Sequence, residues 1–80
     1  MDDADIVHQI GQLAAEEHTL ERSFEGKSPS SLDLDRLRQL EVTLDQCWDL
    51  LRQRRARRDA GQNPDDVTTR SEGVVEGYRQ

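Results

Sequence analysis

The sequence is short of the residues that stabilise most small domains. Its 80 residues include one cysteine, one tryptophan, one tyrosine and one phenylalanine, and only 32% are hydrophobic while 35% are charged. A single cysteine excludes an internal disulfide. So little apolar material cannot enclose a self-contained globular core, but it is enough to line the contact between packed helices. We therefore expect one small domain that depends on a partner.

The sequence also lacks the features of a membrane or secreted protein. No stretch approaches the roughly 20 apolar residues that cross a bilayer. The N-terminus has no basic region followed by an apolar one. These absences predict a cytoplasmic protein with no membrane partner.

Two stretches of the chain carry apolar residues at intervals of three and four positions, with charged residues between them. This is the spacing of helices that pack lengthwise, as in a coiled coil. It predicts an all-α fold built as an antiparallel two-helix hairpin. The members of this seam are Ile6, Ile10, Leu13 and Leu20 in the first stretch, and Leu37, Leu40, Leu44, Cys47 and Leu51 in the second, and Trp48 is expected to join them in the apolar contact.

Local signals set the expected boundaries of this hairpin. We expect helices over about 3–24 and 32–60, a turn over 25–31, and hence a hairpin spanning 1–61. Gly26 permits a left-handed helix stop, Ser30 with Asp33 forms a capping box, and Gly61 ends the second helix. Residues 62–80 are expected to form a polar, extended or partly ordered tail.

The two seams mirror each other about the turn. If Leu20 faces Leu37, three further apolar pairs follow, because the numbers in each pair sum to 57. The same register places Asp3 opposite Arg54, which predicts an ion pair. The further pairs are Leu13 with Leu44, Ile10 with Cys47, and Ile6 with Leu51.

Apolar residues beside the seam widen the apolar stripe of each helix. Val7 and Ala14 lie beside the first seam, and Leu34 and Trp48 beside the second. One partner helix cannot cover a stripe of this width. Two hairpins packed as a four-helix bundle would cover it, and the commonest such arrangement is a two-fold homodimer. The residues expected at that contact are Ile6, Ile10, Leu13, Leu44, Trp48 and Leu51.

Glu17 occupies an apolar position of the first seam, between Leu13 and Leu20. A buried carboxylate must be paired, protonated or bound to a metal. One reading is that the helix rotates slightly, so that Glu17 reaches solvent or an arginine. The other is a polar layer that fixes the register or the oligomeric state.

The arginine-rich segment Arg52–Arg58 suggests an alternative function as a nucleic-acid-associated regulator. Clustered guanidinium groups neutralise phosphates. Against this reading, Arg54 and Arg58 continue the seam and should face the acidic start of the first helix, and the whole chain has a net charge of -6. We therefore expect no nucleic-acid partner. Salt-dependent retention on a DNA column would favour the alternative.

No residue pattern indicates catalysis, a cofactor or a metal. The only histidines, His8 and His18, are ten positions apart, so they do not share a ligand-forming turn. The bundle motif Glu-x-x-His of dimetal proteins is missing, and no glycine-rich phosphate loop occurs. Cys47 at a seam position favours a small buried side chain over a nucleophile. We predict a non-enzymatic protein that interacts with itself and with an unidentified protein.

Several segments carry a resemblance to a known family. The stretch from Leu40 to Arg58, which contains Asp45-Gln46-Cys47-Trp48-Asp49-Leu50-Leu51, resembles the DUF2630 family of short actinobacterial proteins of unknown function. Gly61, the early segments Asp5-Ile6 and Glu16-Glu17-His18-Thr19-Leu20, and the tail Val74-Val75-Glu76-Gly77-Tyr78 are similar too. The resemblance implies a small, mostly helical bacterial protein in which Tyr78 and the tail belong to the working unit. It implies no activity, substrate or cofactor.

Overall fold

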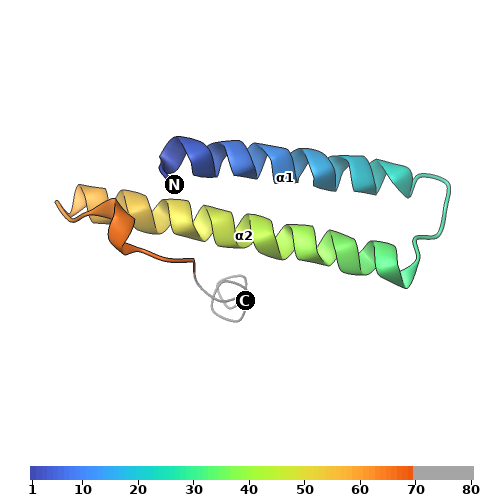
Figure 1. The fold of residues 1–80 in the computed structure, drawn as a ribbon. Helices are drawn as coiled ribbons and strands as arrows, with labels where there is room; N and C mark the ends of the chain where they lie inside the picture. The colour runs from blue at the N-terminus through green and yellow to red at the C-terminus, as the bar shows by residue number, and fades with distance from the viewer. Residues whose placement is uncertain (70–80) are drawn as a thin grey trace.

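The computed structural model describes residues 1–69 of the chain, and within them the fold is a helical hairpin. Helix α1 comprises Asp3–Ser23, helix α2 comprises Ser31–Asp59, and the one-turn 3-10 helix η1 comprises Pro64–Asp66. The two long helices lie side by side in opposite directions, and α2 extends beyond the start of α1 (Figure 1). The predicted all-α hairpin is therefore confirmed, and both predicted helices agree with the observed ones to within one residue at each end.

Both long helices begin with a capping box. At α1, the amide of Asp5 donates to Asp2 Oδ1 at 2.9 Å, and the amide of Asp2 donates to Asp5 Oδ2 at 3.0 Å. At α2, Ser30 and Asp33 make the same reciprocal pair at 3.1 and 3.0 Å. Each pair satisfies a helical amide that has no partner within the helix. The carboxylates also lie at the positive end of the helix dipole.

Two glycines end the helices in the left-handed conformation. Gly26 has φ 70° and Gly61 has φ 73°, as the sequence predicts for both. After Gly61, the side chain of Asn63 accepts a hydrogen bond from the amide of Asp65 at 3.0 Å, and Pro64 occupies the first position of η1. These contacts turn the chain back along α2.

The core lies in the half of the hairpin away from the turn. Ile6 and Leu51 are each only 1% exposed, and they belong to the one buried apolar cluster of residues 1–69. Ile10, Leu44 and Cys47 complete the cluster, and Leu13 and Leu50 pack against it. The residues that the mirror register pairs thus belong to this cluster or, as Leu13 does, pack against it while partly buried.

The packing loosens towards the turn. Leu40 is buried, but Leu20 and Leu37 keep part of their surface in solvent. The seam is therefore closed at one end of the hairpin and incompletely closed at the other.

The predicted tail is described only in part. Residues 62–69 contain η1, while the remaining tail positions, including Tyr78, lie outside the described residues. Over residues 1–69, no helix combines the length and the apolar character needed to cross a bilayer.

Candidate functional site

An ionic cluster centred on Arg54 holds the segments together at the end of the hairpin opposite the turn. The guanidinium donates from Nε to Asp3 Oδ1 and from Nη1 to Asp65 Oδ1, each at 2.7 Å. A longer bond of 3.3 Å runs from Nη1 to the carbonyl oxygen of Pro64. Arg58 Nη2 donates to the other oxygen of Asp3 at 2.8 Å. We call Asp3, Arg54, Arg58 and Asp65 the Arg54 cluster.

The Arg54 cluster connects three segments of the fold. Asp3 begins α1, Arg54 and Arg58 belong to α2, and Asp65 belongs to η1. Arg54 is only 6% exposed although it is charged. The ion pair of Asp3 with Arg54 is the one that the mirror register predicts. The ion pair of Asp65 with Arg54 was not predicted, because Asp65 lies outside the two periodic stretches from which the register was deduced.

The charges of this cluster shift the pKa values of its members. Hydrogen bonds from Arg54, and then from Arg58, hold the pKa of Asp3 below its usual 3.8. The same bonds with Asp3 and Asp65 raise the pKa of Arg54, so the guanidinium stays charged. The ion pairs of Asp3 within the cluster therefore favour folding only while Asp3 is ionised.

The Asp3→Asn variant provides a test of this pH dependence. Because the pKa of Asp3 is lower in the folded chain than in the unfolded one, its stabilisation is complete above about pH 4 and decreases as the pH falls further. We expect the variant to melt at a lower temperature than the original chain at pH 6, and the difference to shrink below pH 4. Melting followed by circular dichroism at constant ionic strength would measure it. A difference that stays constant between pH 6 and pH 2 would contradict the prediction.

The arginine-rich segment is largely engaged within the chain. Arg54 and Arg58 contact Asp3, and Arg57 Nη1 donates to Gln62 Oε1 at 3.2 Å. Over residues 1–69, Arg52 and Arg55 are exposed and make no ion pair. Three of the five arginines thus have partners in the hairpin itself, which does not favour a phosphate-binding surface.

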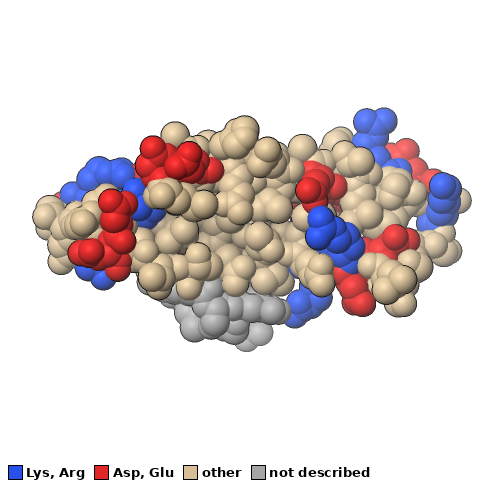
Figure 2. All heavy atoms as spheres, viewed as in Figure 1, with Lys and Arg blue, Asp and Glu red and all other residues tan. Residues whose placement is uncertain are grey.

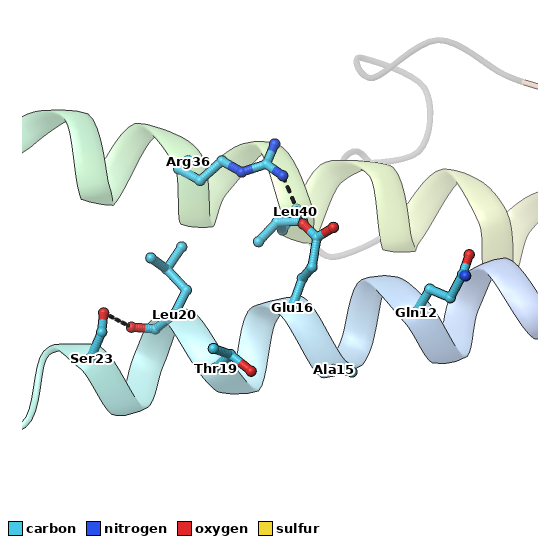
Figure 3. A pocket seen from close by; sticks show the side chains of 8 residues that line it. All are labelled: Gln12, Ala15, Glu16, Thr19, Leu20, Ser23, Arg36 and Leu40. Carbon is cyan, nitrogen blue, oxygen red and sulfur yellow. Dashed lines mark hydrogen bonds and ion pairs between the residues drawn. The ribbon is translucent and has the colours of Figure 1, made fainter.

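One side of the hairpin is hollowed. A groove of about 590 Å³ lies between the helices near the turn. Arg36 Nη2 reaches across it to Glu16 Oε2 at 2.7 Å, over the side chain of Leu40 (Figure 3). We call this the Glu16–Arg36 side. The groove is lined by Gln12, Ala15, Glu16, Thr19, Leu20, Ser23, Arg36 and Leu40.

The ion pair that spans the groove is exposed. The side chains of Glu16 and Arg36 are each 54% exposed, so the pair adds little to stability. In the view of Figure 2, charged side chains gather towards the ends of the hairpin, and an uncharged stretch lies between them over the middle of both helices.

The opposite side of the hairpin carries the exposed apolar residues. Trp48 is 45% exposed and Val7 is 50% exposed. Trp48 and Val7 each come directly after a seam residue, whereas Glu16 and Arg36 each come directly before one. Residues before and after a seam position lie on opposite sides of the seam, so Trp48 and Val7 lie on the side of the hairpin away from the groove. Ala14 directly follows the seam residue Leu13, and Leu34, which is 50% exposed, lies two helical turns before Glu41 on the same face. We call this the Trp48 face, formed by Val7, Ala14, Glu21, Leu34, Glu41, Trp48 and Arg55.

The structure thus separates the residues that the sequence analysis grouped as one contact. Ile6, Ile10, Leu44 and Leu51, expected where two hairpins meet, are already buried inside the single hairpin. A second copy would cover Trp48 and its neighbours instead. The physical reason is that residues at seam positions face the partner helix of the same chain, and only those one position later remain outside.

Other candidate residues are placed as follows. Glu17 is half-buried, so the residue is not fully enclosed in the seam. Cys47 is buried, and burial raises the pKa of its thiol, which disfavours the reactive thiolate. Over the described part of the chain, no three histidine, cysteine, aspartate or glutamate side chains lie close enough together to hold a metal ion.

The burial of Asp49 is not predicted by the helical pattern. It is only 3% exposed, and it accepts a hydrogen bond from Gln53 Nε2 at 2.9 Å. Gln53 Nε2 also contacts the carbonyl oxygen of Thr68 at 3.4 Å. Asp49 lies outside the seam, so the periodic pattern gives no reason to bury it. The spacing of four residues to Gln53 is the only local signal.

Comparison with known proteins identifies relatives without a described function. The profile of a family described as "Protein of unknown function (DUF2630)" matches residues 2–80. Uncharacterized proteins of Mycobacterium bovis (Mb0922c) and Mycobacterium tuberculosis (Rv0898c) are each 43% identical over 77 residues, which cover 95% of this chain and 88% of theirs. No solved structure matches the chain.

Proposed function

Because the chain belongs to the DUF2630 family, for which no activity is described, we propose its role from the geometry alone. The protein acts as a non-catalytic, homodimeric interaction module. Two hairpins pair through the Trp48 face, and the resulting bundle offers its remaining surface to another protein. The observation that carries this proposal is the exposure of Trp48 and Val7 on one side of a hairpin whose seam is already filled.

The energetics of apolar burial support self-association. Trp48 retains 45% of its surface, and Val7 and Leu34 each retain 50%. Fully burying a side chain of this kind contributes roughly 1.5–3 kcal/mol. A two-fold contact uses every such residue twice, because both copies present the same surface. A cytoplasmic location agrees with the exposed charges and with the single free cysteine.

The replacement of Trp48 by serine tests the proposal. We expect the original chain to sediment as a dimer at micromolar concentration, and Trp48→Ser to raise the dimer Kd at least about 30-fold, as loss of a central aromatic contact does. The matched control is Leu32→Ser. Leu32 is 78% exposed but does not follow a seam position, so its replacement should leave the Kd unchanged.

Two readouts separate assembly from folding. Circular dichroism checks that both variants remain helical, and the emission of the single tryptophan should shift to shorter wavelength as the original chain is concentrated. An original chain that is fully helical but monomeric up to 1 mM would overturn the proposed function. So would equal Kd values for the original chain and Trp48→Ser.

A further inference from the structure

We infer that the two copies meet in antiparallel orientation, with the two-fold axis at Trp48, so that Arg55 of each copy pairs with the partner's Glu41. This inference rests on the proposed function and specifies its geometry. The interaction surface is the Trp48 face, and the charges of Glu41 and Arg55 make a second copy of the same chain its complementary partner.

Three residues of α2 lie at equal intervals on the Trp48 face. Glu41, Trp48 and Arg55 are seven positions apart, which is two helical turns, or about 10.5 Å between neighbours. All three follow seam residues and therefore lie on the Trp48 face. A two-fold axis that crosses α2 at right angles at Trp48 exchanges the points about 10.5 Å on either side of it. Arg55 then faces the partner's Glu41, and the pair occurs twice.

The residues of α1 agree with this arrangement. Val7, Ala14 and Glu21 have the same spacing of seven, and the register that pairs Asp3 with Arg54 sets Val7 two positions from the level of Trp48 and Ala14 two positions from the level of Glu41. The exposed side chain of Val7 therefore lies close to the axis in each copy and extends the apolar contact around the two indoles.

Only the antiparallel arrangement brings the opposite charges of α2 together. If the axis ran along the helices, α2 would face α1 of the other copy, and Arg55 would not meet the partner's Glu41. In the antiparallel arrangement, the acidic end of each face meets the arginine of the other. Glu21 and Arg55 are exposed, and over residues 1–69 neither of them nor Glu41 makes an ion pair. All three are thus available for a partner.

Charge reversal tests the pairing. Arg55→Glu and Glu41→Arg should each raise the dimer Kd about tenfold or more, because each converts two attractive contacts into two repulsive ones. The double variant restores both attractions and should return to within about threefold of the original Kd. An equimolar mixture of the two single variants should form a heterodimer as tightly as the original chain forms its dimer.

The distance between the two turns provides an independent test of orientation. Nitroxide labels at Lys27→Cys, in a Cys47→Ala chain shown to dimerise normally, should lie roughly 55 Å apart in the antiparallel dimer. A parallel dimer would bring them within about 25 Å.

The outcomes distinguish the two proposals. A dimer with the short distance, or one whose Kd does not respond to charge reversal, would overturn the antiparallel pairing and leave the homodimer intact. Absence of any dimer in the original chain would overturn both. A long distance together with tight pairing of the mixed single variants would support both.

Discussion

Leu51→Ala is expected to lose about 2–5 kcal/mol of unfolding free energy, the range for large-to-small replacements in a packed core. Leu51 is 1% exposed and belongs to the same cluster as Ile6, which is equally buried. Alanine is a slightly better helix former than leucine, so the loss would come from the cavity and not from the helix. A single core of this size rarely supplies more than about 3–5 kcal/mol. Much of the variant should therefore be unfolded at 25 °C.

Urea unfolding followed by circular dichroism would measure this loss. The comparison must be made at one protein concentration, because self-association would add to the apparent stability. Leu32→Ala is the matched control. Leu32 is 78% exposed, and its replacement should change the free energy by less than about 0.5 kcal/mol. A Leu51→Ala chain as stable as this control would show that the buried cluster does not hold the hairpin together.

Arg54→Leu is expected to have the largest effect among the arginine replacements. The variant would leave Asp3 with Arg58 as its remaining partner and would release Asp65 from α2. We expect a lower melting temperature, and loss of the defined position of η1 in amide chemical shifts. Arg58→Leu should have a smaller effect, since Arg58 is exposed and holds only one oxygen of Asp3.

Arg52→Leu is the matched control for this comparison. Arg52 belongs to the same helix and is exposed, and over residues 1–69 it makes no ion pair. Its replacement should leave both the melting temperature and η1 unchanged. Equal effects of the Arg54 and Arg52 replacements would mean that the buried guanidinium does not join the three segments.

The periodic pattern predicts the seam well for a physical reason. A seam residue is fixed by helix geometry alone, so the pairing of Asp3 with Arg54 follows from a register deduced from leucines many residues away. Gly26, Gly61 and the Ser30 capping box are equally local, because each depends on the conformation of one or two residues. These features could be deduced before any coordinates were known.

Features that depend on packing beyond the seam could not be deduced in this way. Asp65 joins Arg54 only because η1 turns back along α2, and no spacing rule reports that return. The exposed fraction of Trp48 depends on how the two helices rotate about their axes, and the sequence placed this residue beside the seam without separating it from the residues buried within the hairpin. The partial exposure of Leu20 and Leu37 near the turn has the same origin. Periodicity predicts which residues face the partner helix, but it does not predict how closely the two helices pack at each point.

The loop around Gly26 lies at the far end of the hairpin from the Arg54 cluster (Figure 1). Apart from Gly26 and its chain neighbours, no atom of residues 1–69 lies within 4 Å of the position that a Cβ on Gly26 would take, so no other described residue packs over this corner. The entropy of closing a loop rises only slowly with its length. A short epitope or a small fluorescent tag inserted there would therefore leave the buried cluster undisturbed, which makes this corner a suitable handle for following the protein in living cells.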